Sequence, residues 1–292
     1  MGHSKMLRHL TSAVAALAFV GTGGMADAGE KVVFPGAKAV GYDHVEEVSA
    51  ELDMPKNAKG RMPAVVILHG SGGIDGRGQF HAQALNDAGI ATLEVYMFAR
   101  GHRPQQGSVK TLTHGYGALK YLAGRPDIDP QRIGVMGFSW GGGMSMRMAS
   151  KSVSDAFLAN TNGLRFVAHA PFYPVCWSHT RIMRSGMSDY RAFTGAPVLL
   201  FAGGQDDYGA SDDCKNFLEA LPEQTRNHMM LQFYPEATHG WDSQDDRART
   251  FYDQYAFGGR GGQVRFIPDK GIAEDSRKRV VEFFVRTLKT VQ

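Results

Sequence analysis

Strand-like and helix-like segments alternate along most of this chain, and this alternation restricts the fold more than any other feature of the sequence. Short apolar runs predict strands at 64–68, 90–97, 132–136, 166–170, 197–202 and 229–234. Helix-like runs lie between or after them, at 79–88, 109–123, 140–149, 211–221 and 273–288. Buried strands joined by helices are typical of a mostly parallel sheet with helices on both faces. Residues 31–52 add a pattern typical of antiparallel edge strands, so we expect an α/β fold with about eight strands.

The N-terminal segment has the features of a secretory signal peptide. Lys5 and Arg8 form a positive start, residues 10–20 are mostly apolar, and Ala26-Asp27-Ala28 resembles a cleavage site. We therefore predict a signal peptide at 1–28, one α/β domain at 29–292, and a periplasmic or secreted location. The apolar run is too short to span a bilayer, and an uncleaved anchor is the alternative interpretation.

Charge and motif content argue against several classes of function. The net charge of +3 includes two positive charges and one negative charge from the signal segment, so the mature chain is near balance. A nucleic-acid partner is not expected, because it requires a concentrated basic face. No later segment is apolar enough to span a membrane, so the mature protein is expected to be soluble. The sequence has no zinc-protease or phosphate-loop motif, and we predict no metal and no cofactor.

Two cysteines, Cys176 and Cys214, remain after removal of the signal segment. In an exported protein such a pair is a disulfide candidate. Two buried free thiols are the alternative, because the sequence does not give the distance between them.

Reactive side chains follow four of the predicted strands. Ser139 lies in a Gly-x-Ser-x-Gly turn after 132–136, between a strand and a helix. Asp206 and Asp207 follow 197–202, and His239 follows 229–234. The segment after 64–68 includes Ser71 among glycines. Because the carboxyl ends of parallel strands meet at one edge of a sheet, these groups are expected to converge.

The converging groups are those that acyl transfer requires. Ser139 is the candidate nucleophile and His239 the base that takes its proton. A carboxylate, Asp206 or Asp207, holds the imidazole and stabilises its charged form. The backbone N–H groups of Trp140 and Ser71 are the candidate donors of an oxyanion hole.

Five segments are similar to motifs of the dienelactone hydrolase family of α/β hydrolases, in its exported branch; they lie at 65–73, 129–142, 172–176, 203–214 and 234–241. The resemblance covers roughly residues 62–288 and implies an α/β-hydrolase fold. It selects Asp206 over Asp207 as the acid. It also implies arginines that bind a substrate carboxylate, for which Arg100 and Arg103 are candidates, although either can be a surface or structural residue. Founding members use a cysteine nucleophile, whereas this chain has Ser139.

We therefore expect a serine hydrolase that cleaves a small ester or lactone and is a monomer or a small homo-oligomer. Three alternatives remain open from the sequence. They are a polyester- or cutinase-like hydrolase, an exported peptidase of the same fold, and a catalytically silent binding protein.

Overall fold

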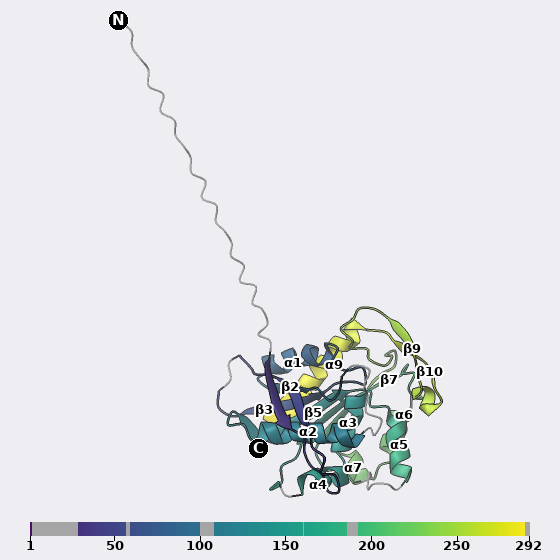
Figure 1. Ribbon diagram of the computed structural model, residues 1–292. Coiled ribbons are helices and arrows are strands. Elements are labelled where there is room, and N and C mark those ends of the chain that lie inside the picture. Colours follow the sequence, from purple (N-terminus) through teal and green to yellow (C-terminus); the bar gives the residue numbers. More distant parts are fainter. Residues whose placement is uncertain (2–28, 57–58, 100–107, 160, 186–191, 290–292) are drawn as a thin grey trace.

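The computed structural model describes residues 1, 29–56, 59–99, 108–159, 161–185 and 192–289. Its main sheet has eight strands in the order β1-β2-β4-β3-β5-β6-β7-β8 (Figure 1). In that spatial order the strands are β1 (Glu30–Pro35), β2 (Glu47–Asp53), β4 (Ala91–Val95), β3 (Met62–Leu68), β5 (Ile128–Phe138), β6 (His169–Phe172), β7 (Val198–Gly203) and β8 (Met229–Tyr234). β1 pairs antiparallel with β2, and β2 with β4, while the other neighbours are parallel. The expected α/β fold, with antiparallel strands at one edge, is confirmed.

The burial of the strands explains why they could be predicted from the sequence. Every residue of β3, β4 and β7 is buried, so these strands are continuous apolar runs with few interruptions. The edge strand β1 alternates instead, with Val32 and Phe34 buried and Val33 exposed. A strand covered on one face needs apolar residues only at every second position.

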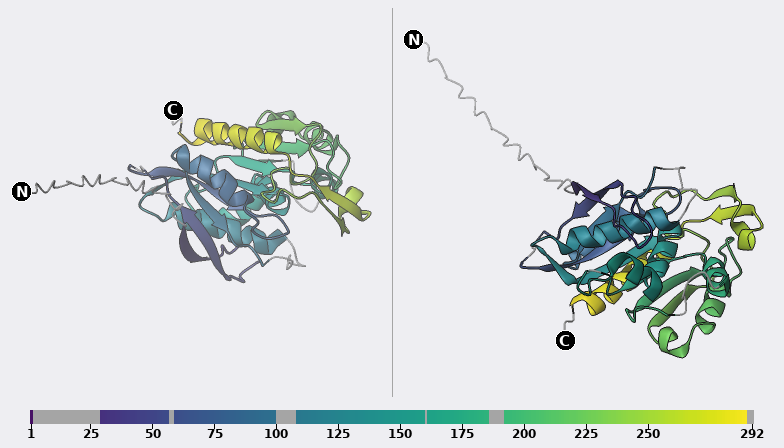
Figure 2. Two further views of the ribbon diagram at one scale, coloured as in Figure 1. Left: turned by 90° about the horizontal axis from the view of Figure 1, so that it is seen from above. Right: turned by 60° about the horizontal axis from the view of Figure 1, so that its bottom comes forward.

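Helices cover both faces of the sheet (Figure 2). α1 (Arg77–Asp87) and α9 (Lys270–Phe284) pack on one face against Val65 and Ile67 of β3. α2 (Ser108–Ala123) packs on the other face against Val66 and Leu68, where Met144 and Met148 of α3 (Trp140–Met148) join the same cluster. A strand sends alternate side chains to opposite faces, so β3 anchors both layers.

Several elements were not predicted from the sequence. They are α4 (Lys151–Leu158), α5 (Cys176–Ser185), α7 (Glu223–Arg226), α8 (Ala256–Gly259) and a separate hairpin of β9 (Arg249–Asp253) and β10 (Gly262–Phe266). α6 (Asp213–Glu219) lies within its predicted range, and a π-helical turn, η1 (Val285–Lys289), continues α9. The hairpin projects beside β7 at the end of the molecule remote from β1 (Figure 1). Within the described ranges, no helix combines the length and apolar character needed to cross a bilayer.

Candidate active site

Ser139 lies at a sharp turn between β5, which ends at Phe138, and α3, which begins at Trp140. Its backbone has φ 51° and ψ −108°, a strained conformation for a residue with a side chain. The flanking glycines are required by close approach. A Cβ on Gly137 would lie 2.4 Å from the Gly141 carbonyl carbon, and one on Gly141 would lie 2.0 Å from the Leu68 oxygen. This is the geometry that presents a serine hydroxyl at the end of a sheet.

The structure brings Ser139, His239 and Asp206 together. His239 Nε2 lies 2.8 Å from Ser139 Oγ, and His239 Nδ1 lies 2.7 Å from Asp206 Oδ2. The imidazole of His239 is completely buried. A neutral imidazole that donates from Nδ1 to a carboxylate leaves the Nε2 lone pair directed at the serine hydroxyl.

The neighbouring carboxylate, Asp207, points to a different partner. Its oxygens accept hydrogen bonds from Arg265 Nε at 2.8 Å, Nη2 at 2.7 Å and the backbone N–H at 2.9 Å. Burial works to raise the pKa of Asp207, but these contacts with Arg265 outweigh it and hold the pKa below its usual value. The two adjacent aspartates therefore have separate environments, one at His239 and one at the β9–β10 hairpin.

Three aromatic rings surround the imidazole of His239. The ring centroids of Tyr173, Tyr208 and Phe266 lie 4.7, 4.4 and 5.1 Å from its centroid. The backbone N–H of Tyr208 also donates to Asp206 Oδ1 at 2.9 Å. Packing on several sides limits the orientations that the imidazole can take.

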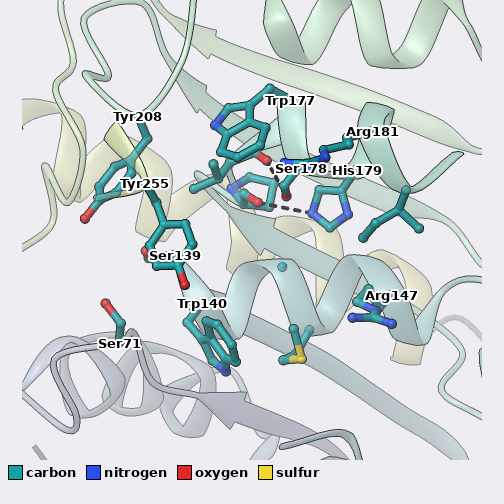
Figure 3. Close-up of a pocket in the computed structure, with 15 residues that line it drawn as sticks. Ser71, Ser139, Trp140, Arg147, Trp177, Ser178, His179, Arg181, Tyr208 and Tyr255 are labelled. Carbon is teal, nitrogen blue, oxygen red and sulfur yellow. Dashed lines mark hydrogen bonds between the residues drawn. The ribbon is translucent and has the colours of Figure 1, made fainter. Parts of the chain in front are cut away.

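A pocket of about 390 Å³ opens beside Ser139 (Figure 3). Ser71 and Trp140, the residues expected to supply the oxyanion donors, line it together with Ser139. Most of its wall comes from the segments around α3 and α5, with side chains that the sequence did not identify, namely Arg147, Trp177, Ser178, Arg181, Tyr208 and Tyr255. They come from four separate segments of the chain that carry no shared motif, so only the fold brings them together.

His69 organises the loop that carries Ser71. Its Nε2 accepts the backbone N–H of Met97 at 3.0 Å, and its Nδ1 lies 2.7 Å from the Gly70 carbonyl oxygen. Burial lowers the pKa of His69, so the neutral ring can accept at one nitrogen and donate at the other. His69 therefore holds the loop after β3 and the loop after β4 together.

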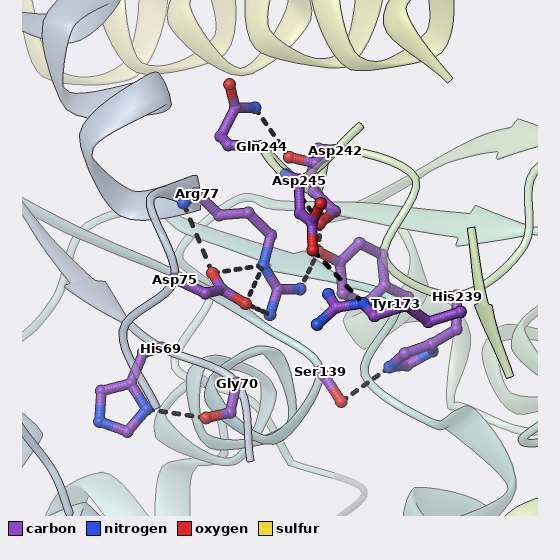
Figure 4. A network of polar contacts seen from close by, with 12 residues as sticks. His69, Gly70, Asp75, Arg77, Ser139, Tyr173, His239, Asp242, Gln244 and Asp245 are labelled. Atoms are coloured by element: carbon purple, nitrogen blue, oxygen red, sulfur yellow. Dashed lines mark hydrogen bonds and ion pairs between the residues drawn. The ribbon is translucent and has the colours of Figure 1, made fainter. Parts of the chain in front are cut away.

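A second polar cluster lies behind the site, on the side of α1 (Figure 4). Arg77 donates from Nη1 to the hydroxyl of Tyr173 at 2.8 Å and is paired with Asp75 through Nη2 at 2.6 Å. The Tyr173 hydroxyl donates to Asp242, whose other oxygen lies 3.0 Å from His81 Nε2. The sequence offered one signal for this cluster, namely two opposite charges, Asp75 and Arg77, shortly after the Gly70–Gly73 turn.

The remaining predicted residues have two different outcomes. Cys176 and Cys214 form a disulfide with the sulfurs 2.01 Å apart, which joins the first residue of α5 to α6. Arg100 and Arg103 lie outside the described residues, as do positions 2–28 of the predicted signal peptide. Over the part of the chain that the structure describes, no three His, Cys, Asp or Glu side chains gather in a way that could hold a metal ion.

Comparisons with known proteins show a family from the sequence and a common fold from solved structures. The model of the "Dienelactone hydrolase family" matches residues 48–288. Acyl-coenzyme A thioesterase 1 of Rattus norvegicus is 23% identical over 219 residues, which are 66% of this chain and 51% of that protein. The chain spans about half the length of the curated relatives it matches.

Two solved structures have a similar architecture. The Est2 esterase of Thermogutta terrifontis with bound propionate has a TM-score of 0.60 and 18% identity, covering 89% of this chain and 94% of that chain. Est1E of Butyrivibrio proteoclasticus with bound ferulic acid has a TM-score of 0.57 and 19% identity, covering 84% and 96%. At such low identity the likeness shows a common fold.

Proposed function

The chain belongs to the dienelactone hydrolase family, and on this premise we propose that it is a serine hydrolase that cleaves a carboxylic ester or lactone through an acyl-enzyme on Ser139. The single observation that carries the proposal is the position of His239, with one ring nitrogen at Ser139 and the other at Asp206. A serine hydroxyl is a weak nucleophile, and a base at hydrogen-bond distance activates it.

Acylation follows from this geometry. Ser139 Oγ attacks the carbonyl carbon while its proton passes to His239 Nε2, and the carbonyl electron pair moves onto oxygen. The backbone N–H groups of Trp140 and Ser71 are proposed to donate to this oxyanion. The intermediate then collapses, the bond to the leaving oxygen breaks, and His239 returns the proton to that oxygen.

Deacylation repeats the same steps with water. A water molecule gives a proton to His239 Nε2 and attacks the acyl carbon. The bond to Ser139 Oγ breaks, the proton returns to Oγ, and the acid is released. Asp206 stabilises the imidazolium in both steps and keeps its own charge.

We propose a small ester or lactone as the substrate. The pocket beside Ser139 holds about 390 Å³ and is walled largely by aromatic and apolar side chains, including Trp140, Trp177 and Tyr255. Est2 and Est1E, which have a similar fold, hold propionate and ferulic acid. A panel of short alkyl esters, aryl esters and lactones compared by kcat/KM narrows the class further.

Export is part of the proposal. The charged start, the apolar run and Ala26-Asp27-Ala28 support cleavage after residue 28 and a mature domain at 29–292 in the periplasm or outside the cell. The Cys176–Cys214 disulfide supports the same conclusion, because disulfides persist in oxidising compartments. The exported protein then begins at Gly29, which an intact-mass measurement checks.

The test of the mechanism is a pair of serine variants at the two sides of the pocket. Ser139→Ala is expected to lower kcat for p-nitrophenyl acetate by roughly 10⁴-fold or more, because the nucleophile is lost. Ser71→Ala is the matched control. It removes a hydroxyl that lines the same pocket but leaves the backbone N–H in place, so it is expected to cost less than tenfold. Turnover by Ser139→Ala close to that of the unmodified protein would contradict the assignment.

A further inference from the structure

Arg77, the first residue of α1, is buried at the meeting point of the loops that carry the candidate site. Its side chain is 4% exposed. Besides the hydrogen bond to Tyr173, it donates from Nε at 2.9 Å and Nη2 at 2.6 Å to the carboxylate of Asp75. Figure 4 shows the guanidinium between Asp75 and Tyr173.

Two of these loops touch Arg77 directly. A Cβ placed on Gly70 would lie 3.0 Å from Arg77 Nη2 and 3.7 Å from Ser139 Cβ, so the guanidinium packs against the backbone of the loop that carries Ser71. The Cζ atom of Arg77 also lies 5.4 Å from the centroid of the Phe138 ring, the residue before Ser139. Arg77 therefore contacts both the proposed oxyanion loop and the nucleophile turn.

Arg77 is linked to the third loop, which carries His239, through Tyr173. The Tyr173 ring packs edge-on against His239, with centroids 4.7 Å apart. Its hydroxyl accepts from Arg77 and donates to Asp242, which lies in the same loop as His239. Tyr173 is 1% exposed and has a backbone φ of 36°, in the left-handed region that favours glycine. The surroundings hold this residue in an unfavourable conformation.

The charges of the cluster support a fixed geometry. Burial opposes the charge of Arg77, but Tyr173, Asp75 and Asp242 outweigh it and raise the pKa of Arg77 well above its usual value. Burial likewise works to raise the pKa of Asp242, and His81, Arg77 and Tyr173 together bring that pKa below its ordinary value. Buried ions that remain charged need every partner in place, so displacement of one group disturbs the others.

We propose that Arg77 and Tyr173 are positioning residues of the hydrolytic reaction, which hold the oxyanion loop, the Ser139 turn and the His239 loop at fixed relative positions. This inference rests on the proposed function, because it assigns the two residues to the reaction of Ser139. Neither side chain takes part in making or breaking bonds. They affect the reaction by fixing the positions of the residues that they contact, namely Gly70, Phe138 and His239.

The chain offers a matched control with the same chemistry elsewhere. Arg125 donates from Nε at 2.9 Å and Nη2 at 2.8 Å to Asp127, and from Nη1 at 3.0 Å to the Tyr121 hydroxyl. This cluster precedes the first residue of β5, whereas Ser139 follows the last. At about 3.3 Å per residue the two ends of β5 are roughly 30 Å apart. The Arg125 cluster can therefore stabilise the fold without touching the reaction.

The experiment compares Arg77→Lys and Tyr173→Phe with Arg125→Lys and Tyr121→Phe. Lysine keeps the positive charge but not the planar guanidinium, which donates to two partners at once. Phenylalanine keeps the ring of tyrosine but not its hydroxyl. We expect the first pair to lower kcat for p-nitrophenyl acetate about 10- to 100-fold with KM changed less than about twofold, because misplacement by about 1 Å costs this much. The rate of Ser139 modification by a fluorophosphonate is expected to fall in parallel. The control pair is expected to leave both rates unchanged.

Unfolding midpoints of all four variants separate positioning from stability, and rates are measured well below those midpoints. Equal kcat in the unmodified protein and in Arg77→Lys and Tyr173→Phe would overturn the inference while leaving the proposed function intact. If Arg77→Lys does not fold, Tyr173→Phe decides alone, since it removes one hydroxyl. An unmodified protein that neither hydrolyses the ester nor reacts with the fluorophosphonate would overturn the proposed function and this inference together.

Discussion

Two histidine–aspartate pairs lie close to the same strand ends, and they have different surroundings. In one, His239 Nδ1 meets Asp206 at 2.7 Å and its Nε2 meets the Ser139 hydroxyl at 2.8 Å. In the other, His81 Nε2 meets Asp242 at 3.0 Å, and both side chains are completely buried. The second oxygen of Asp242 accepts a hydrogen bond from the Tyr173 hydroxyl, so this pair belongs to a buried polar cluster.

The difference shows that a histidine–carboxylate pair does not by itself define a reactive site. His239 follows β8 and adjoins Ser139, which lines an open pocket. His81 lies in α1, with its ring 5.2 Å from that of Phe138 and 5.0 Å from that of Phe172. What differs is the third partner, which is the pocket-lining Ser139 for one pair and Tyr173 for the other. Which partner each pair has depends on where the fold places it.

The comparison predicts opposite outcomes for two Asp→Asn variants. Asp206→Asn is expected to lower kcat by about 10⁴-fold, because the imidazole loses its tautomer control, with little change in the unfolding midpoint. Asp242→Asn is expected to lose about 3 to 5 kcal/mol of unfolding free energy, because it leaves buried charges unpaired. Steady-state kinetics and urea unfolding of both variants measure the two effects.

The matched control for Asp206→Asn is Asp207→Asn, one residue along. Asp207 is paired with Arg265, on the β9–β10 hairpin, so its loss is expected to reduce activity less than tenfold because a partly exposed ion pair contributes little. The assignment of the acid is wrong if Asp207→Asn is the more damaging of the two.

Two other buried histidines extend the comparison to pH. Burial lowers the pKa of His114 to about 4, with help from the charge of Lys110. Burial also lowers the pKa of His169 to about 4, and its Nδ1 lies 3.1 Å from the backbone oxygen of Ser145. Between an ordinary histidine value of 6.5 and this lowered value, the unfolded chain takes up protons that the folded chain does not. The unfolding free energy is therefore greatest above pH 6.5 and falls as the pH drops toward 4.

The expected loss is roughly 2 to 3 kcal/mol for each of the two histidines over that range. The carboxylates with lowered pKa, such as Asp242, contribute their loss only at lower pH, because their ordinary value is 3.8. Urea unfolding followed across the interval measures the slope. A stability that stays flat from neutral pH down to about 4 would contradict the burial of these neutral histidines.

Much of the architecture was predictable because it depends on local patterns. Buried parallel strands are continuous apolar runs, and the chemistry of a parallel sheet collects after their ends. The prediction that Ser139, His239 and a carboxylate would converge needed only the order of strands and the short loops after β5, β7 and β8. The family resemblance was needed to select Asp206 over Asp207, because both follow β7 directly.

The remainder depends on contacts between distant segments. Tyr173 meets Arg77 and Asp242 only after β6, the His239 loop and α1 pack together. Tyr173 is separated from these two partners by 96 and 69 positions in the chain, so no local pattern indicates the contacts. The β9–β10 hairpin was also missed. Three consecutive residues of β9 are exposed, so the strand lacks the regular apolar alternation by which a strand is recognised.

Peptide mapping after treatment with a fluorophosphonate tests the central claim most directly, namely that Ser139 is the group that forms the acyl-enzyme. The account predicts one phosphonyl adduct, on Ser139, with loss of p-nitrophenyl acetate hydrolysis in proportion to the modified fraction. An adduct on another serine, or full activity in protein whose Ser139 is completely modified, would contradict it.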